Sequence, residues 1–502
     1  MRELLPAAAR GRVGAWSPPR LRPVLHLVSG MLLVLSGTML LPAAADGLSR
    51  HPDWRSFALS ALATFICGGL LFRRTRSSLA GGLSLRQAFV LTPLAWLTVT
   101  LFAAMPLYFS GYGRVGESFT DAFFEAMAGL TTTGATVLTG LDRAPPGILL
   151  WRALLQWLGG IGIIATAIAI LPALGVGGMQ LFRTESSDRS EKVRPRVREI
   201  AGMIAAVYCA FTIACGLAYW SAGMAPFDAL AHALTTVSTA GFSTSDLSIG
   251  NWSSPAVDWI AIVFMLSGAL PFVLYVRLLH RDMSALRSSQ VRTLLGFVVT
   301  VTLLLTAWLV LTGRYGPADA LRYAAFNVVS IVTTTGYATT DYMLWGNAAV
   351  GVFFGLIFIG GCTGSTSGGI KVFRFEVMAR LLRGHFLRLL YPRGVFPRTY
   401  AGRPLPDEVM VSVVVFFSLY FACYSAITIA LMGLDLDFLT SASAAASALS
   451  NVGPGLGLTI GPAGSYGPLP DAAKWLLCFA MLLGRLDLFT VLILFVPRFW
   501  KG

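Results

Sequence analysis

The chain has 502 residues, of which 55% are hydrophobic and only 12% are charged, whereas soluble domains carry about 25% charged residues. This composition excludes an ordinary soluble protein and indicates a membrane protein. The net charge of +14 could suggest a nucleic-acid partner, but the positive residues gather in a few connections, so none is expected.

Ten apolar runs predict membrane-spanning helices, because about 20 apolar residues cross the hydrocarbon core of a bilayer. In chain order they cover residues 23–45, 56–72, 87–109, 151–175, 200–221, 256–276, 293–312, 347–369, 408–432 and 475–497. The first run has a basic start and ends in "LPAAAD", as a signal peptide would. Its apolar core is too long for one and a second span follows, so we interpret it as a retained helix.

Lysine and arginine are distributed unevenly over the connections between these runs. Residues 73–86, 183–198, 277–292 and 371–403 contain 22 of them, whereas the opposite connections contain 6. Because cytoplasmic connections carry the excess of positive charge, we expect the first set, and both termini, to be cytoplasmic.

Classes other than transport find little support. The six cysteines form no CxxC pair and lie mostly in apolar runs, so neither disulfides nor zinc is expected. The five histidines are scattered, and no HExxH or GxSxG motif suggests a membrane enzyme. Without a Walker motif or a long soluble domain, no organic cofactor is expected in this chain.

Four segments recur and align on one glycine each: "DAFFEAMAGLTTTGAT" on Gly134, "DALAHALTTVSTAGFS" on Gly241, "YAAFNVVSIVTTTGYA" on Gly336 and "TSASAAASALSNVGPG" on Gly453. The residue three positions before each glycine carries a hydroxyl group, and the residue two positions before it is polar. These pairs are Thr131 and Thr132, Ser238 and Thr239, Thr333 and Thr334, and Ser450 and Asn451. Each segment begins with about 10–12 small or apolar residues, which suit a re-entrant half-helix rather than a span.

The repeated unit is thus a span, a short pore helix, a polar loop and a second span. Four such units around a pseudo-fourfold axis would bring the loops together, and rings of loop carbonyls can replace the hydration shell of K⁺. Calcium or magnesium would need carboxylates, which the loops lack. We expect an all-α polytopic membrane protein with an N-terminal pair of spans (1–85) and four pore repeats (86–182, 183–288, 289–404 and 405–502).

Longer motifs point to a known family: "QWLGGIGIIATAIAILPALGVGGMQLFRTES", "AAFNVVSIVTTTGYATTDY", "GGCTGSTSGGIKVFR", "NVGPGLG" and "GRLDLFTVLILFVPRFW". With them, nearly the whole chain resembles the Trk/Ktr/HKT superfamily of potassium transporters, specifically its TrkH-type members. The resemblance implies K⁺ as the transported ion, contacted by the eight polar loop residues. It also implies a homodimer in the inner membrane and a cytosolic TrkA-type ring that binds nucleotides and gates the pore.

Two points of the resemblance concern selectivity and gating. Relatives with serine at the first filter glycine conduct sodium, so Gly134 favours potassium over a sodium pore. Some relatives are more polar around the position of Pro271. Passive transport and proton symport both stay open. The basic connections 183–198 and 371–403 are the natural docking surface for the partner ring.

The stretch "GGCTGSTSGG" lies late in the second span of the third repeat, and its glycines disfavour a continuous helix. It is either a gate below the filter or a small-residue packing surface with a kink. The resemblance favours a gate formed by Gly360, Gly361, Thr363, Gly364, Ser365, Thr366, Ser367, Gly368 and Gly369.

Arg485 lies in the middle of the last span, where an unpaired charge is costly. Either it completes the gate by repelling cations, or it forms a structural ion pair, for which Asp487 is awkwardly placed. Lys371 is interpreted as a snorkelling residue at the membrane edge. Cation attraction at the outer mouth and helix capping both stay open for Asp121, Glu125, Asp228 and His232.

Overall fold

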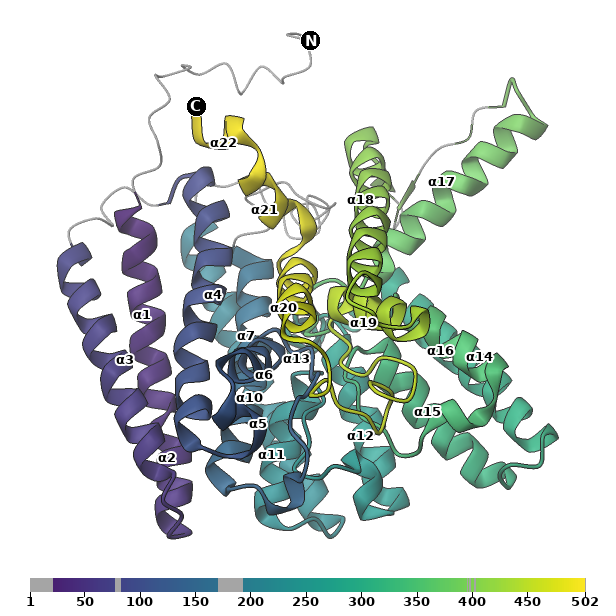
Figure 1. Cartoon of the computed structure of the whole chain (residues 1–502). Helices are drawn as coiled ribbons and strands as arrows, with labels where there is room; N and C mark the ends of the chain where they lie inside the picture. Colours follow the sequence, from purple (N-terminus) through teal and green to yellow (C-terminus); the bar gives the residue numbers. More distant parts are fainter. Residues whose placement is uncertain are drawn as a thin grey trace.

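The computed structural model describes residues 21–76, 83–169, 193–394, 396, 399–400 and 403–501. Over these ranges the fold is a bundle of helices, with the N-terminal helices along one side and the C-terminal ones near the middle (Figure 1). Two short strands, β1 (Thr399–Tyr400) and β2 (Arg403–Pro404), pair antiparallel in the connection after the third repeat. The fold class predicted from the sequence is confirmed.

The N-terminal pair consists of α1 (Arg22–Thr38) continued by α2 (Leu40–Leu48), and of α3 (Trp54–Thr75). These helices pack on one another and on α4 (Leu85–Ser110) of the first repeat (Figure 1). The buried carboxylate of Asp46 accepts a hydrogen bond of 2.6 Å from the backbone N–H of Gly147. This bond satisfies a backbone amide that has no partner within α7 (Pro146–Ala169), and it fixes the N-terminal pair of helices to the first repeat.

The remaining helices follow the predicted repeat. The first repeat adds α5 (Gly113–Glu117), the pore helix α6 (Phe119–Leu130) and η3 (Leu141–Arg143) between α4 and α7. The second contains α10 (Val193–Ser221), the pore helix α11 (Pro226–Val237), η4 (Ser248–Trp252), α12 (Pro255–Ala269), α13 (Phe272–Leu279) and η5 (Met283–Arg287). The third contains α14 (Ser289–Leu311), the pore helix α15 (Pro317–Val332), η6 (Tyr342–Trp345), α16 (Asn347–Leu356) and α17 (Val372–Leu390). The fourth contains α18 (Asp407–Met432), the pore helix α19 (Phe438–Ser450), α20 (Asp471–Leu486), α21 (Leu488–Leu492), η7 (Ile493–Phe495) and α22 (Pro497–Lys501).

Among the described residues, seven helices are long and apolar enough to cross a membrane, or up to nine if each of two bent pairs is one span. The bent pairs are α12 with α13, at 92°, and α20 with α21 and η7, at 115°. In the third repeat α16 ends after ten residues at Leu356. The prediction of continuous spans at 256–276 and 475–497 is therefore wrong, whereas the end of α16 at Leu356 agrees with the non-helical glycine-rich stretch expected within 347–369. Residues 170–175 of the fourth predicted span lie outside the described residues.

Each interruption has a local cause in the sequence. Pro271 lacks the amide that would continue α12 and starts α13 instead. The glycines of 360–369 favour loop over helix in the third repeat. In the fourth repeat Asp487 adopts a positive φ of 67°, which ends α20. Over the described residues, the second helix thus breaks in three repeats, whereas α7 of the first repeat is continuous over Pro146–Ala169.

The pore helices pack unusually closely against glycines of the second helices. A methyl group would lie too close to a pore-helix carbonyl oxygen at three equivalent positions: Gly159 against Leu130 (1.9 Å), Gly268 against Val237 (2.9 Å) and Gly484 against Leu449 (1.9 Å). Each of these carbonyls belongs to the residue four positions before a filter glycine. Small residues let helix backbones approach inside a membrane, so the three repeats share one packing contact.

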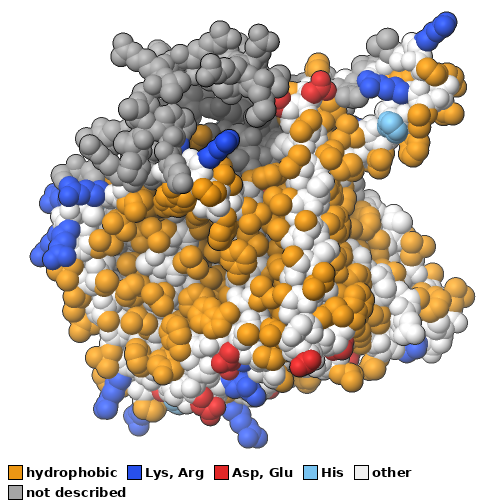
Figure 2. Space-filling view, turned by 45° about the horizontal axis from the view of Figure 1, so that its top comes forward, with side chains coloured by type: hydrophobic (Ala, Val, Ile, Leu, Met, Phe, Trp, Pro, Cys, Tyr) orange, Lys and Arg blue, Asp and Glu red, His pale blue; other side chains and the backbone are white. Residues whose placement is uncertain are grey.

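The surface agrees with a membrane environment. In the face shown in Figure 2, hydrophobic side chains cover the middle of the molecule, and charged side chains lie mainly toward its margins. Large apolar side chains are exposed on several spans, including Leu59, Ile213, Leu304 and Val411. An apolar belt of this extent is unfavourable in water and is expected where lipid covers the protein.

Replacing Gly159 by alanine should destabilise the protein by about 1–3 kcal/mol, because the added methyl group must displace a pore-helix backbone. Thermal unfolding of the purified protein in detergent measures this loss. The matched control is Gly296→Ala on α14, where a methyl group meets no atom within 4 Å and helix propensity gains about 0.5–1 kcal/mol. Equal melting temperatures for the two variants would contradict the packing described here.

Candidate ion filter and gate

The four polar loops end their pore helices with the same backbone conformation. The residue two positions before each glycine has a positive φ: Thr132 at 52°, Thr239 at 50°, Thr334 at 58° and Asn451 at 54°. The φ angles of the filter glycines are also positive: 78° for Gly134, 80° for Gly241, 81° for Gly336 and 105° for Gly453. Positive φ is a genuine outlier for β-branched threonine, and such strain persists where the surroundings enforce it, often at functional sites.

The four loops contact one another in a closed cycle. A methyl group on each filter glycine would strike the carbonyl oxygen of the residue before the next filter glycine: Gly134 against Ala240 (2.1 Å), Gly241 against Thr335 (1.8 Å), Gly336 against Val452 (2.1 Å) and Gly453 against Thr133 (2.6 Å). The order runs from the first repeat to the fourth and back to the first. The loops therefore surround one axis, and only glycine permits this approach.

The polar residues of the loops are all buried: Thr131, Thr132, Ser238, Thr239, Thr333, Thr334, Ser450 and Asn451. Several of their side chains hold the loops in place. The Thr131 hydroxyl bonds that of Thr133 (2.7 Å), and the amide of Asn451 donates to the same Thr133 hydroxyl (3.0 Å). In the third repeat Thr333 and Thr335 repeat the hydroxyl pair at 2.8 Å. The structure thus brings all four predicted loops together.

The glycine-rich segment 360–369 lies against one end of this ring. Ser367 Oγ donates to the carbonyl oxygen of Thr333 (2.7 Å), and the backbone N–H of Gly368 donates to Thr334 Oγ1 (2.7 Å). Thr366 Oγ1 bonds Thr239 Oγ1 (3.0 Å), which belongs to the second repeat. The four filter glycines line a cavity at the other end, which we call the vestibule.

The segment is fixed from the second repeat at the break of α12. The backbone N–H groups of Cys362 and Thr366 donate to the carbonyls of Ala269 (2.9 Å) and Gly268 (3.1 Å). The N–H of Phe272, just after Pro271, donates to the Gly364 carbonyl (3.0 Å). Pro271 therefore turns its helix aside and frees the carbonyls that bind the segment.

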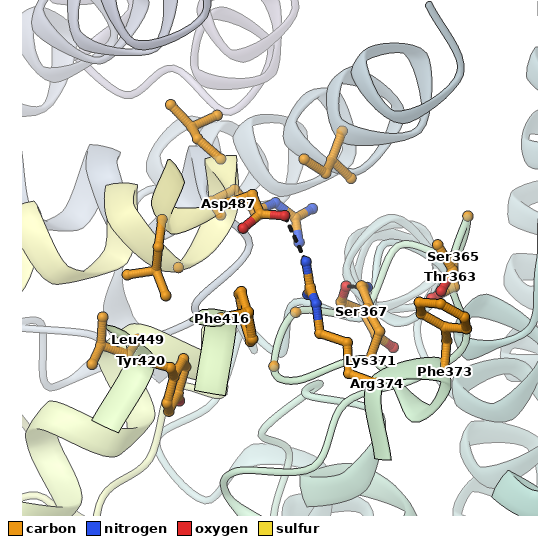
Figure 3. A pocket seen from close by; sticks show the side chains of 18 residues that line it. Thr363, Ser365, Ser367, Lys371, Phe373, Arg374, Phe416, Tyr420, Leu449 and Asp487 are labelled. Atoms are coloured by element: carbon orange, nitrogen blue, oxygen red, sulfur yellow. Dashed lines mark hydrogen bonds and ion pairs between the residues drawn. The ribbon is translucent and has the colours of Figure 1, made fainter. Parts of the chain in front are cut away.

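A second cavity, which we call the basal cavity, lies beside the segment and is lined by Ser367, Lys371, Arg374, Arg485 and Asp487 among others (Figure 3). Arg485 is only 4% exposed, and its Nη1 donates to the Thr366 carbonyl (2.9 Å). The Lys371 ammonium donates to the Ser367 carbonyl. The prediction that Lys371 snorkels to the membrane edge is wrong, because its charge turns back to the glycine-rich segment.

The partner of Asp487 is Arg374 and not Arg485. Arg374 Nη2 lies 2.6 Å from Asp487 Oδ2, and both side chains are largely buried. Within the described part of the chain, no acidic residue forms an ion pair with Arg485, whose hydrogen bond goes to the neutral carbonyl of Thr366. Asp487, which the sequence already placed awkwardly for a pair with Arg485, therefore does not neutralise Arg485.

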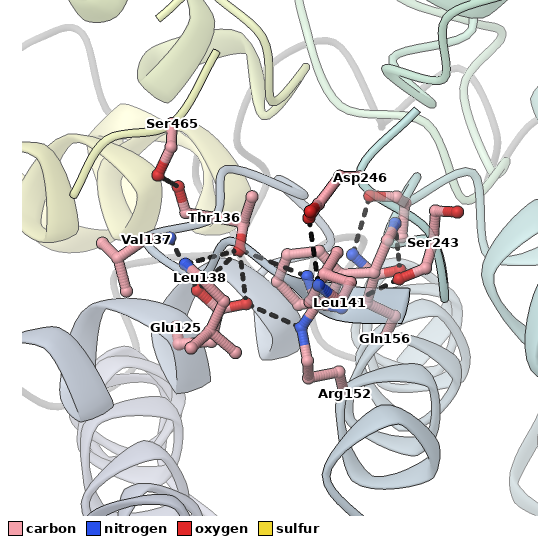
Figure 4. A network of polar contacts seen from close by, with 12 residues as sticks. Glu125, Thr136, Val137, Leu138, Leu141, Arg152, Gln156, Ser243, Asp246 and Ser465 are labelled. Carbon is pink, nitrogen blue, oxygen red and sulfur yellow. Dashed lines mark hydrogen bonds and ion pairs between the residues drawn. The ribbon is translucent and has the colours of Figure 1, made fainter. Parts of the chain in front are cut away.

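Near the vestibule, Glu125 is buried and holds the loops instead of lining the opening. Glu125 forms an ion pair of 2.7 Å with Arg152 and accepts from the backbone N–H of Val137 (2.9 Å) (Figure 4). Arg152 also donates to the Ser243 carbonyl (2.9 Å), which ties the first repeat to the second. Both charges are buried, and such a pair is stable only when its remaining hydrogen-bonding groups are satisfied.

The other three residues left open by the sequence behave similarly. Asp121 is buried and pairs with Lys474 of α20. The carboxylate of Asp228 accepts a hydrogen bond from Thr244 Oγ1 (2.7 Å), and His232 Nε2 lies 3.0 Å from Ser243 Oγ. These contacts join the pore helix of the first repeat to α20 of the fourth, and the pore helix of the second repeat to its own filter loop, so they favour a structural role over cation attraction.

Several residues of the site were not predicted, among them Arg152 and Arg374, described above, and Gln156 and Asp246. Gln156 on α7 donates from Nε2 to the Ala240 carbonyl (2.7 Å) and accepts from the Phe242 N–H (3.0 Å), so it holds the second filter loop from the first repeat. Asp246 lines the vestibule and accepts from the N–H of Gly140 (2.7 Å). A polar residue inside an apolar span could have indicated Gln156, whereas Asp246 lies in a loop with no such signal.

Comparisons with known proteins agree with this architecture. Residues 55–501 match the family model of TrkH, described as a cation transport protein. The chain is 47% identical to the Trk system potassium uptake protein TrkI of Halomonas elongata, over 96% of this chain and 97% of that protein. It is 36% identical to the Trk system potassium uptake protein TrkH of Escherichia coli K12, over 96% and 99%.

A solved structure gives the same result. The crystal structure of the potassium transporter TrkH from Vibrio parahaemolyticus matches with a TM-score of 0.88 and 36% identity, over 96% of this chain and 100% of that one. These relatives are transport proteins and not enzymes. The chain belongs to the TrkH family of cation transport proteins.

Proposed function

We propose that this chain takes up potassium across the inner membrane through the ring of filter loops. The observation that carries the proposal is the closed cycle in which each filter glycine receives a carbonyl oxygen of the next loop. Relatives over nearly the whole chain are named as potassium uptake proteins. Rubidium uptake into liposomes that contain the purified chain or its Arg485→Gln variant tests the proposal, and no uptake above empty liposomes by either protein would contradict it.

The chemistry of the loops suits a monovalent cation. A cation that enters a narrow pore must exchange water for protein oxygens, and backbone carbonyls supply them without a fixed charge. The loops offer hydroxyl and amide side chains at Thr131, Thr132, Ser238, Thr239, Thr333, Thr334, Ser450 and Asn451, and no carboxylate. We assign potassium contacts to these residues, with Gly134, Gly241, Gly336 and Gly453 setting the spacing between the loops.

The glycine-rich segment 360–369 and Arg485 form the gate in this proposal. The segment bonds filter residues of the second and third repeats, and a methyl group on Gly368 would lie 2.3 Å from the Ser450 carbonyl of the fourth. A segment so close to three of the four loops obstructs the axis. The buried guanidinium of Arg485 adds a fixed positive charge that repels a cation from the basal cavity.

The remaining parts of the proposal concern orientation and partners. The bias of positive residues supports a cytoplasmic location for the termini and for the connection 371–403. On α17 and just after it, Arg383, Arg388 and Arg393 are exposed. We assign to these residues the docking of a cytosolic TrkA-type nucleotide-binding ring that controls the gate. The chain itself is taken to assemble as a homodimer.

Replacing Gly134 by serine should reduce the preference for rubidium over sodium by about tenfold, which corresponds to about 1.4 kcal/mol. The serine Cβ would lie 2.1 Å from the Ala240 carbonyl oxygen, so the ring must widen at this point. Competitive rubidium and sodium uptake into liposomes measures the preference. Gly351→Ser, whose Cβ meets no atom within 4 Å, is the control, and equal selectivity in both variants would remove Gly134 from the filter.

Replacing Arg485 by glutamine should raise basal rubidium uptake by about tenfold, because the charge that repels cations from the basal cavity is lost. The control is Arg277→Gln, which removes an exposed arginine that pairs with Asp282. Uptake rates are compared at equal protein content and after size-exclusion chromatography. An unchanged or lower rate in a well-folded Arg485 variant would show that the arginine is structural.

Replacing Arg383, Arg388 and Arg393 together by glutamine should weaken binding of a TrkA-type ring by about tenfold, with the largest effect at low salt. Binding of the purified ring to the detergent-solubilised chain measures the affinity. The control variant replaces Arg50, Arg55 and Arg143, which are exposed on connections of the opposite set. Full affinity in the first variant, or an equal loss in both, would contradict the docking surface.

A further inference from the structure

The Arg374 guanidinium joins three elements beside the basal cavity. It extends from the first turn of α17, which directly follows the glycine-rich segment. Its Nη2 lies 2.6 Å from Asp487 Oδ2, at the break between α20 and α21, and the group stacks 3.6 Å from the ring centroid of Phe416 on α18 (Figure 3). One buried cation therefore connects the end of the segment with both long helices of the fourth repeat.

Asp487 occupies a conformation that the rest of the structure must enforce. Its φ of 67° and ψ of 127° are rare for any residue but glycine. The chain bends by 115° at this point. The Asp487 carbonyl accepts from the N–H of Thr490 (3.0 Å) as α21 begins. The ion pair with Arg374 is the charged contact that fixes the bend.

The same bend determines where Arg485 lies. Arg485 is two residues before Asp487 in the last turn of α20, and its Nη1 contacts the Thr366 carbonyl in the glycine-rich segment. If the bend straightened, this turn would move and the Arg485 contact would lengthen. The contact between Arg485 and the glycine-rich segment is thus maintained by the ion pair of Arg374 with Asp487, which includes neither Arg485 nor a residue of the segment.

We propose that Arg374 and Asp487 form a latch that positions Arg485 on the glycine-rich segment and keeps the pathway closed. Arg374 is a positioning residue, since it acts through the bend at Asp487. Release of the latch lets the fourth-repeat bend relax, withdraws Arg485 from the Thr366 carbonyl and frees the segment. The inference rests on the gating role proposed above.

A purely structural pair would also contact these elements, but it would behave differently when broken. If the pair were purely structural, its loss would lower the stability of the protein, but Arg485 would still keep the pathway closed. Loss of a latch raises basal uptake, and this effect disappears once Arg485 has been removed, because both changes act through one contact. Non-additivity of this kind is the signature of two residues in one pathway.

The experiment compares basal rubidium uptake into liposomes for Asp487→Asn, Arg374→Gln, Arg485→Gln and the double variant Asp487→Asn with Arg485→Gln. Asparagine has the shape of aspartate and tolerates positive φ, so Asp487→Asn removes the charge of the pair without adding backbone strain at this position. The control is Arg380→Gln, which breaks another ion pair of α17, with Glu376 at 3.8 Å. Thermal unfolding of each variant is recorded in parallel.

We expect Asp487→Asn and Arg374→Gln each to raise uptake by about tenfold over the unsubstituted chain, a shift of about 1.4 kcal/mol in the closed-to-open equilibrium. The double variant should match Arg485→Gln within about twofold. Arg380→Gln should leave uptake unchanged. Should Arg374→Gln not fold, Arg374→Lys keeps the charge without the planar stack on Phe416 and should still raise uptake, to a smaller extent.

Two outcomes would overturn the latch without touching the proposed function: Arg485→Gln raises uptake while Asp487→Asn does not, or the two effects multiply in the double variant. If Arg485→Gln itself leaves uptake unchanged, the gate of the proposed function fails first. If the unsubstituted chain and Arg485→Gln both pass no rubidium, potassium conduction itself is contradicted. The three failures are therefore distinguishable in one set of measurements.

Discussion

The structure depends on the approach of a carbonyl oxygen to a residue without a side chain. At each filter glycine, the space that a Cβ would fill is taken by the backbone of the next loop, and the four contacts close a cycle. The same kind of close contact recurs between the pore helices and the second helices, where carbonyl oxygens of the pore helices approach glycines of the second helices. Because apolar side chains gain little by association inside lipid, close backbone packing of this kind supplies much of the cohesion between membrane helices.

Fourfold repetition brings the loops together, but departures from it form the parts of the proposed gate. The second helix of the first repeat continues past its filter, whereas those of the other three break at Pro271, at the glycine-rich segment and at Asp487. The breaks expose carbonyls and place Lys371, Arg374 and Arg485 around one cavity. Positive charge at the end of a cation pathway is unfavourable for conduction, so this asymmetry supports the proposal of a gate at the basal cavity.

Much of this arrangement could be predicted from residue patterns. The repeat of a hydroxyl, a polar residue and a glycine at positions such as Thr131, Thr132 and Gly134 predicted the filter loops, because local backbone demands repeat with the sequence. The bends at 256–276 and 475–497 were missed, since hydropathy records apolar length and not direction. The pairing of Arg374 with Asp487 joins residues that lie 113 positions apart, and only the packed fold places them in contact.

The central claim is that the ring of filter loops binds a monovalent cation on its axis. An experimental density map of the purified protein in rubidium, with anomalous scattering to identify the ion, tests it most directly. The account predicts an anomalous peak on the axis enclosed by Gly134, Gly241, Gly336 and Gly453, and its loss when rubidium is replaced by an organic cation. A map in which these glycines enclose no ion, or do not surround a common axis, would contradict it.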